Sequence, residues 1–237
     1  MDFSKIRAVT FDAGGTLLQP YPSVAHIYGQ VMRDHGLIAD LSEIKSAFLS
    51  IYQKRQRAPR QNISENSEWE WWRDTVKEIL DLLNLQANDF DALYQEMWGT
   101  FSEARCWRIA DHALSAIQTM KRLGMKTAIL SNWDKRLRCI LTEMNITELF
   151  DKIFISSEIG VEKPNAKIFR YVEKQFDLPS HCFLHIGDSR IHDFEGAKKV
   201  GWNVLLLVDK GSFEKDLLSN EINGFRELED MANNITR

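Results

Sequence analysis

The chain of 237 residues is long enough for one large α/β domain, or for a core domain with a smaller insert. A formal net charge of −4 gives no basic excess of the kind that nucleic-acid binding requires. No apolar run is long enough for a signal peptide or a membrane span, and the three cysteines form no CxxC pair. We therefore expect a cytoplasmic protein with no nucleic-acid or membrane partner. The oligomeric state is left open.

The first predicted strand covers residues 6–11, an apolar and β-branched run that suits a parallel strand buried on both faces. Asp12 follows it directly, and Gly14 and Gly15 then allow a tight turn. The next predicted strand begins only at residue 127. This spacing indicates a large insert after the first strand.

Helical patterns fill most of the insert. Apolar residues recur every three or four positions near 24–32, 44–51, 72–83 and 93–101, and the polar stretch 55–67 is predicted to be a long loop. Trp69 and Trp72 share one helical face and are expected in the core of the insert, whereas Trp71 points elsewhere. We predict an all-helical cap domain over residues 20–107, with 1–19 and 108–237 forming the core. A helical insert beside a small-molecule site is suited to act as a lid.

After the insert, strands and helices alternate as far as residue 208. Strands are predicted at 127–130, 153–155, 182–186 and 204–208, and helical stripes lie near 113–123, 137–144, 168–176 and 194–200. Such alternation indicates an α/β fold with a doubly wound parallel, Rossmann-like sheet. Ligands of such sheets bind outside the carboxyl ends of the strands. The polar residues that follow the predicted strands are Asp12, Ser131, Asn132, Lys163, Asp188 and Asp193.

These side chains have complementary tasks in phosphoryl transfer. A carboxylate such as Asp12 can attack phosphorus and form an acyl phosphate. Clustered carboxylates repel one another unless a hard cation lies among them, and oxygen ligands favour Mg²⁺, which also neutralises charge on a phosphoryl group. Ser131 can bind phosphate oxygens, and Lys163 can offset the charge on Asp12 and on the phosphoryl group.

The chain resembles the haloacid dehalogenase superfamily in four motifs, which occur in that family's order. They are the sequence FDAGGTL at 11–17, Ser131-Asn132, Lys163-Pro164, and Gly187-Asp188-Ser189 with Asp193. The insert lies where the helical cap of that family lies. Within the superfamily the chain is similar to the small helical-cap branch that holds many phosphatases.

The resemblance implies a role for each matching residue. Asp12 is the expected nucleophile, assisted by Lys163 and Ser131. Mg²⁺ is expected to be held by Asp12, the Gly14 carbonyl and Asp188, with Asp193 supporting these ligands. The residues expected to bind the phosphate and the substrate are Gly15, Thr16, Ser131, Asn132 and Lys163. The predicted function is therefore Mg²⁺-dependent hydrolysis of a small phosphorylated metabolite.

One position departs from the pattern. Phosphatases of the superfamily usually carry a second aspartate two residues after the nucleophile, where this chain has Gly14. That aspartate protonates the leaving group, and general acid–base help contributes roughly 10²–10⁴-fold. Three alternatives therefore stay open: a phosphometabolite-binding protein with little turnover, a 2-haloacid dehalogenase, which needs no metal, and a phosphonate hydrolase. The last requires a Schiff-base lysine in the cap, where Lys45, Lys54 and Lys77 lie.

Overall fold

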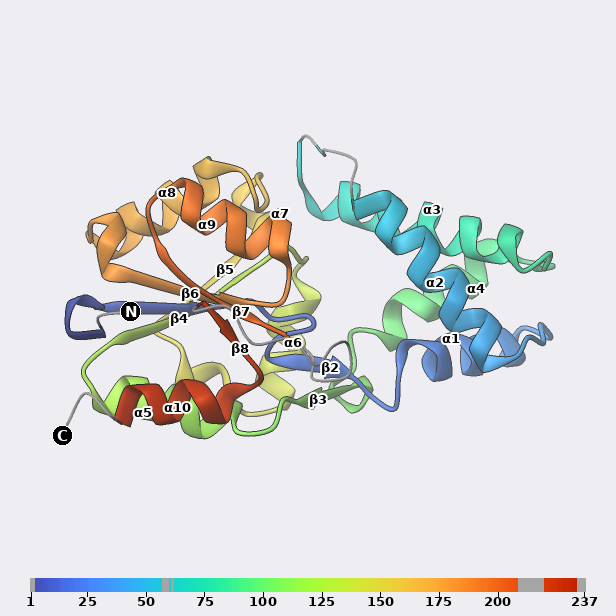
Figure 1. Cartoon of the computed structure of the whole chain (residues 1–237). Helices are drawn as coiled ribbons and strands as arrows, with labels where there is room; N and C mark the ends of the chain where they lie inside the picture. The colour runs from blue at the N-terminus through green and yellow to red at the C-terminus, as the bar shows by residue number, and fades with distance from the viewer. Residues whose placement is uncertain (1–2, 57–59, 61, 209–219, 234–237) are drawn as a thin grey trace.

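The computed structural model describes residues 3–56, 60, 62–208 and 220–233. Two parts are visible in Figure 1, an α/β core and a smaller group of helices, and the chain passes between them twice. Each part has its own buried hydrophobic cluster.

The core is built on one sheet in which β1 is central. Its neighbours are β4 and β6, and every pairing in the sheet is parallel, in the order β5-β4-β1-β6-β7-β8. All four residues of β1 are buried, as its apolar sequence predicts. The strands are β1 (Ala8–Phe11), β4 (Lys126–Ser131), β5 (Lys152–Ile155), β6 (Phe183–Gly187), β7 (Asn203–Leu207) and β8 (Glu221–Ile222).

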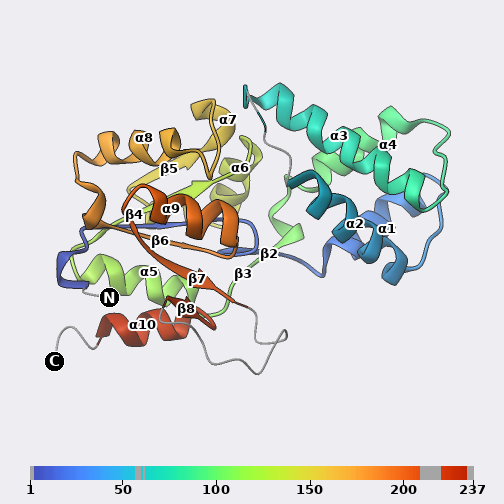
Figure 2. The ribbon, with the colours of Figure 1, turned by 45° about the horizontal axis from the view of Figure 1, so that its top comes forward.

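Helices cover both faces of this sheet, as Figures 1 and 2 show. One face packs against α5 (Ala113–Arg122), α6 (Arg136–Glu143) and α10 (Phe225–Asn233). The other packs against α7 (Ser156–Ile159), α8 (Ala166–Phe176) and α9 (Gly196–Lys199), and a π-helical turn over Arg190–Glu195 precedes α9. The predicted doubly wound α/β fold is confirmed.

The helical part packs around its own cluster of buried side chains. Its helices are α1 (Val24–Asp34), α2 (Leu41–Gln56), α3 (Glu65–Leu82) and α4 (Phe90–Thr100). The hydroxyl of Ser23 caps α1, and a capping box of Ser64 and Ser67 fixes the start of α3. Residues 55–67 were predicted to be one long loop, which is wrong at both ends because α2 continues through Gln56 and α3 begins at Glu65. Residues 57–59 and 61 lie outside the described residues.

A two-stranded antiparallel ribbon lies where the chain leaves the core and returns to it. It pairs β2 (Leu18–Pro20) with β3 (Trp107–Ile109) and was not predicted from the sequence. The ribbon spans both of the predicted domain boundaries, so the cap is held to the core at its base by paired backbone. The bounds 20 and 107 stay a prediction.

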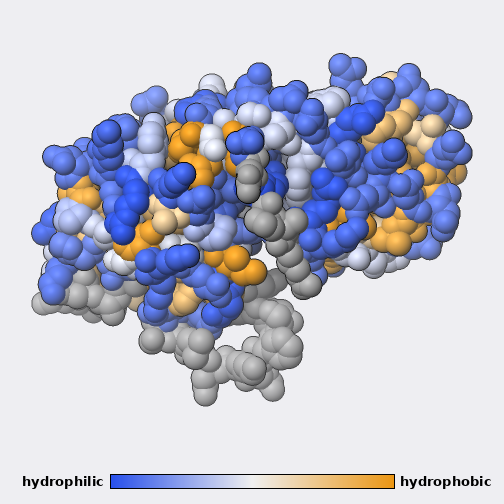
Figure 3. Space-filling view, turned by 90° about the horizontal axis from the view of Figure 1, so that it is seen from above, coloured by the Kyte–Doolittle hydropathy of each residue, from blue (hydrophilic) through white to orange (hydrophobic). Residues whose placement is uncertain are grey.

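The face of the molecule seen in Figure 3 is mostly hydrophilic over both parts, with hydrophobic side chains in separate patches. Among the described residues, no helix combines the length and the apolarity that crossing a membrane requires.

Candidate active site between core and cap

The ends of β1, β4 and β6 bring distant residues together around one buried lysine. The Lys163 ammonium donates to Asp12 Oδ1 at 2.8 Å, to Asp193 Oδ1 at 2.6 Å and to the Leu130 carbonyl at 2.8 Å. These three bonds use all three of its protons. Lys163 is almost wholly buried, so the ammonium stays at this point because its partners compensate the loss of water.

Asp193 is the most constrained of the three carboxylates. Besides accepting from Lys163, its Oδ1 lies 2.9 Å from His185 Nε2, and its Oδ2 accepts from the Ser189 N–H at 2.9 Å. The other nitrogen of the His185 ring lies 2.8 Å from the Thr10 hydroxyl. His185 is therefore a buried, hydrogen-bonded histidine, and it helps to fix the position of Asp193.

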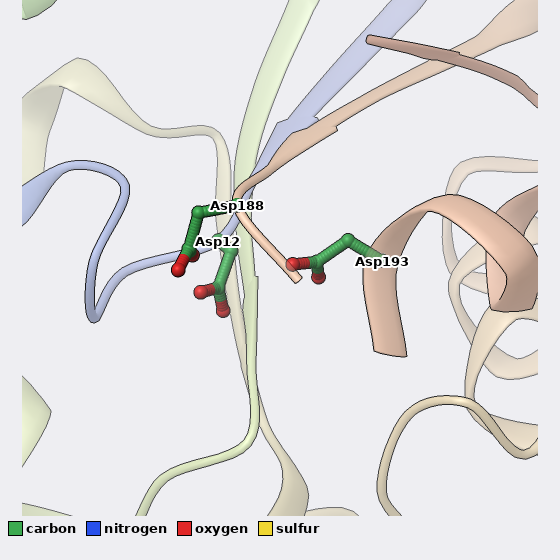
Figure 4. Close-up of side chains that lie close together, drawn as sticks. All are labelled: Asp12, Asp188 and Asp193. Atoms are coloured by element: carbon green, nitrogen blue, oxygen red, sulfur yellow. The ribbon is translucent and has the colours of Figure 1, made fainter. Parts of the chain in front are cut away.

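Asp188 lies beside Asp12, and Figure 4 shows Asp193 reaching toward this pair from the turn that precedes α9. The fully buried Thr16 donates its hydroxyl to Asp188 Oδ1 at 2.9 Å. Gly15 has a φ of +82°, and a Cβ there would lie only 2.5 Å from Asp188 Oδ2. Glycine is thus required both for the backbone turn and for the close approach of the carboxylate. Thr16 lies behind Asp188 and positions it.

The loop that carries Lys163 is held by the amide of Asn132. Asn132 Nδ2 donates to the Lys163 carbonyl, and its Oδ1 accepts from the Lys163 N–H, each at 2.8 Å. Ser131 is buried at the end of β4, and a hydrogen bond from its hydroxyl favours the ionised form of Asp12 by lowering the pKa of that carboxyl. The residues expected at the strand ends therefore meet at one place.

The charges of the cluster are unbalanced. Burial and the charge of Asp193 raise the pKa of Asp12, although Lys163 opposes this shift. Asp188 is open to the space under the cap, yet the loss of water there, with the charges of Asp12 and Asp193, raises its pKa to about 7. Burial alone would lower the pKa of Lys163, but the two neighbouring carboxylates outweigh it and raise that pKa. Three carboxylates lie near one ammonium, that of Lys163, so binding of a further cation is favoured here.

The residues fit Mg²⁺ in ligand type and spacing. Asp12, Asp188 and Asp193 each offer an oxygen atom, and these atoms lie within 4.8 Å of one another. Carboxylate and carbonyl oxygens are the ligands that Mg²⁺ prefers. Because both oxygens of Asp193 already accept hydrogen bonds, Asp12 and Asp188 are the more available ligands. The positive charge would offset the repulsion that raises the pKa of Asp188.

A cavity of about 460 Å³ lies over this cluster, between core and cap. Its floor includes Asp12, Asp188 and Lys163, together with Gly14 and His192. The wall formed by the cap is largely aromatic, and its aromatic residues include Tyr28, Phe48, Tyr52, Trp72, Tyr94 and Trp98. Trp72 also packs against the hydrophobic cluster of the cap, as does Trp69. These aromatic residues were not predicted to form a binding site, because their helical spacing fits a cap core equally well.

The side of the cavity nearest Gly14 is closed by an aromatic ring of the core. A Cβ built on Gly14 would lie 3.2 Å from Trp133 Cζ3. The Trp133 ring packs in turn on Trp107, with 4.9 Å between the ring centroids. The space beside Gly14, where the resemblance to phosphatases of the superfamily implies a carboxylate, is therefore bounded by a tryptophan. Sequence reasoning missed Trp133, although it follows Ser131-Asn132 directly.

Comparisons with known proteins agree with this geometry. The family model described as haloacid dehalogenase-like hydrolase matches residues 6–201. The haloacid dehalogenase-like hydrolase domain-containing protein 3 of Mus musculus is 27% identical over 206 residues, covering 86% of this chain and 82% of its own length.

Three solved structures share the fold. A HAD-family hydrolase of Bacillus subtilis, YfnB, solved with bound magnesium, has a TM-score of 0.80 at 21% identity, covering 96% of this chain and 99% of its own. A HAD phosphatase of Thermococcus onnurineus has a TM-score of 0.66 at 22% identity, covering 95% of this chain and 97% of its own. The L-2-haloacid dehalogenase of Xanthobacter autotrophicus has a TM-score of 0.73 at 18% identity, covering 96% of this chain and 98% of its own. The match over most of the chain shows that this protein belongs to the haloacid dehalogenase-like hydrolase family.

Proposed function

We propose that this hydrolase is an Mg²⁺-dependent phosphatase of a small phosphorylated metabolite, acting through an aspartyl-phosphate intermediate on Asp12. The observation that carries the proposal is the position of Lys163, whose ammonium bridges Asp12 and Asp193 beside Asp188. This arrangement offers a nucleophilic oxygen, a fixed cation and a pair of metal-binding carboxylates at the floor of one cavity. A dianionic phosphoryl group matches that set of charges.

The chain's own residues account for the first chemical step. An oxygen of Asp12 attacks phosphorus as the bond from phosphorus to the leaving oxygen breaks, and Lys163 offsets the charge shared between this carboxylate and the phosphoryl oxygens. Ser131 can donate to the phosphoryl oxygens. When bound, Mg²⁺ would lower the repulsion between the incoming phosphoryl group and the carboxylates. Water then cleaves the aspartyl phosphate and releases inorganic phosphate.

The alternatives receive less support. A 2-haloacid dehalogenase needs no metal, whereas this chain keeps Asp188 and Asp193 beside the nucleophile. The cap lysines that a phosphonate hydrolase would require, Lys45, Lys54 and Lys77, are all exposed, and none of them lines the cavity. A lysine outside the cavity is not placed to form a Schiff base with a substrate bound there.

Turnover of acetyl phosphate and of phosphate esters, with Mg²⁺ and with a chelator, tests the proposal. We expect phosphate release only with the metal, and we expect Asp12→Asn to reduce kcat/KM by about 10³-fold or more, because the variant keeps the shape but lacks the nucleophile. Asp111→Asn, which changes an exposed aspartate outside the site, is the matched control and should behave as the unmodified protein. Phosphate binding without any release would instead identify a binding protein, and metal-independent release of halide from a 2-haloacid would identify a dehalogenase.

A further inference from the structure

Beyond the charged residues of its floor, the cavity is lined largely by aromatic side chains of the cap. Tyr52 is stacked between Phe48, at 5.4 Å and 11°, and Trp72, at 5.9 Å and 19°. Burial and the charges of Asp188 and Asp12 raise the pKa of Tyr52, which is the effect expected of a ring that faces the two carboxylates across the cavity. Both faces of the Tyr52 ring are covered, so a wall of packed aromatic rings, rather than one open ring face, lies opposite the nucleophile.

The aromatic lining continues around the cavity to the core. Tyr28 contacts both Phe48 and Phe101 edge to face, at 5.6 and 5.8 Å between ring centroids. Phe101 contacts Trp107 at 6.0 Å, and Trp107 contacts Trp133, the ring that borders Gly14. A group attached to the phosphate thus meets ring faces and ring edges on several sides. Such walls recognise flat, apolar groups by stacking and area burial.

In the described lining of the cavity, no positively charged side chain is available to bind a second anionic group. Its lysine and arginine side chains are Lys163 and Arg136. Lys163 is used by the carboxylates, and Arg136 makes two bonds of 2.7 Å to Asp134 and a third, of 3.1 Å, to the Trp98 carbonyl. The guanidinium also lies over the Trp98 ring. A leaving group with its own phosphate or carboxylate would find no available cation among these residues.

The missing acid at Gly14 points to the same class of leaving group. Without a carboxylate to supply a proton, a P–O bond breaks readily only if the departing oxygen is a stable anion. A phenol such as the tyrosine side chain has a pKa of about 10, against about 15.7 for water, which resembles an alcohol. A phenolate can therefore leave unprotonated where an alkoxide cannot.

We infer that the substrate is an aryl phosphate monoester, in which a flat, uncharged aromatic group is bonded to phosphate through a phenolic oxygen. This inference rests on the proposed phosphatase function and names its substrate class. An oxygen of Asp12 forms a bond to phosphorus as the bond from phosphorus to the aryl oxygen breaks. The electron pair leaves on the phenolate, which takes a proton from solvent. Water then hydrolyses the aspartyl phosphate, which regenerates Asp12 and releases inorganic phosphate.

Two measurements test the inference. The first compares turnover of phenyl phosphate, cyclohexyl phosphate and glycerol phosphate with Mg²⁺ present. We expect kcat/KM for phenyl phosphate to exceed both others by about 100-fold or more, because only phenolate leaves without an acid. The second measures calorimetric Kd values for phenylphosphonate and methylphosphonate, which cannot be hydrolysed. We expect phenylphosphonate to bind about tenfold more tightly, as stacking on aromatic side chains predicts.

Two substitutions on α3 test whether the preference for phenylphosphonate comes from the cavity wall. Trp72→Leu should remove most of the phenylphosphonate advantage, whereas Trp71→Leu should keep it, because Trp71 is absent from the cavity lining. Circular dichroism melting serves as the check that both variants are folded. Equal Kd values for the two phosphonates, or turnover of glycerol phosphate equal to that of phenyl phosphate, would overturn the inference and leave the phosphatase function intact. Failure to hydrolyse any phosphate compound, with the phenylphosphonate advantage retained, would overturn the phosphatase function instead.

Discussion

At the residue scale, Gly14 lies two residues after Asp12, beside a tryptophan ring. The resemblance to phosphatases of the superfamily implies an acid at this position, and the Trp133 ring bounds the space where a side chain would begin. With glycine in place of an acid, position 14 offers no proton donor, and the Trp133 ring forms an apolar wall beside it. These two residues, Gly14 and Trp133, lie far apart in the sequence.

Restoring the carboxylate alone should not restore the acid. Gly14→Asp brings a Cβ within 3.2 Å of a ring that already packs on Trp107, so we expect a loss of about 1 kcal/mol of stability from overpacking. The double variant Gly14→Asp with Trp133→Leu opens the space, and we expect it to hydrolyse an alkyl phosphate about 10²-fold faster than the unmodified protein. Thermal melting and kcat/KM for cyclohexyl phosphate measure the two effects. A gain by the single variant equal to that of the double variant would show that Trp133 does not limit the site.

At the element scale, α3 connects the cap to the core on the side opposite the ribbon. Glu65, the first residue of α3, accepts from the Lys135 N–H at 3.1 Å and from the Ser157 hydroxyl. Nearby, Arg60 bridges Glu68 of the cap and Glu162 of the core. The cap is thus held at two sides of the cavity, by paired backbone at β2 and β3 and by polar contacts at α3.

These contacts at α3 should favour the closed position of the cap. Glu65→Ala removes both bonds to the core, and we expect KM for phenyl phosphate to rise about fivefold, which corresponds to about 1 kcal/mol, with little change in kcat. Glu70→Ala is the control, because this acidic residue of the same helix accepts a hydrogen bond from Asn66, which also lies within the cap. Steady-state kinetics with phenyl phosphate measure KM and kcat for both variants. A normal KM in Glu65→Ala, or an equal rise in Glu70→Ala, would show that these bonds do not hold the cap.

The elements that the sequence predicts are those whose own residues carry the signal. The runs that became β1, β4, β5, β6 and β7 are apolar over several residues, because strands buried on both faces must be. The ribbon was missed, since β2 and β3 have three residues each, include Pro20, and pair with each other across the whole helical insert. The two-residue β8 was missed because it is even shorter.

The candidate site also has one part that the sequence predicts and one part that it does not. Asp12, Ser131 and Asp188 could be identified because the carboxyl ends of parallel strands must meet at one edge. The aromatic cavity wall could not, because whether a helical face meets its neighbours or a cavity depends on how the helices pack. Trp72 illustrates this, since it packs against the cap core, as its periodicity predicts, and also lines the cavity.

At the scale of the whole molecule, the candidate active site lies between two parts that each have their own buried hydrophobic residues. The core supplies the charged floor and the cap supplies most of the aromatic wall. On the proposed function, phosphoryl chemistry and leaving-group selection would be carried by different segments of the chain. A change in the cap would then alter the substrate without disturbing the proposed nucleophile Asp12 and Lys163.

Metal binding should stabilise the molecule as a whole. At a Mg²⁺ concentration 100 times its Kd, mass action adds about 2.7 kcal/mol, or a rise in Tm of roughly 5–10 °C for a chain of this size. Asp188→Asn should abolish this rise because it removes one of the two more available carboxylate ligands, whereas Asp111→Asn should keep it. Calorimetric melting with and without Mg²⁺ measures both. A Tm that does not respond to Mg²⁺, or a response that survives Asp188→Asn, would contradict the metal site.

The most direct measurement of the central claim is the capture of the phosphoryl group on the nucleophile. With Gly14 in place of an acid–base carboxylate, no residue at that position activates water, so the aspartyl phosphate should accumulate during turnover of phenyl phosphate with Mg²⁺. Acid quenching followed by peptide mass spectrometry should find one added phosphoryl group on Asp12, and none in Asp12→Asn. Phosphate release by a protein that carries no phosphoryl group at any time point, or carries it on another residue, would contradict the mechanism.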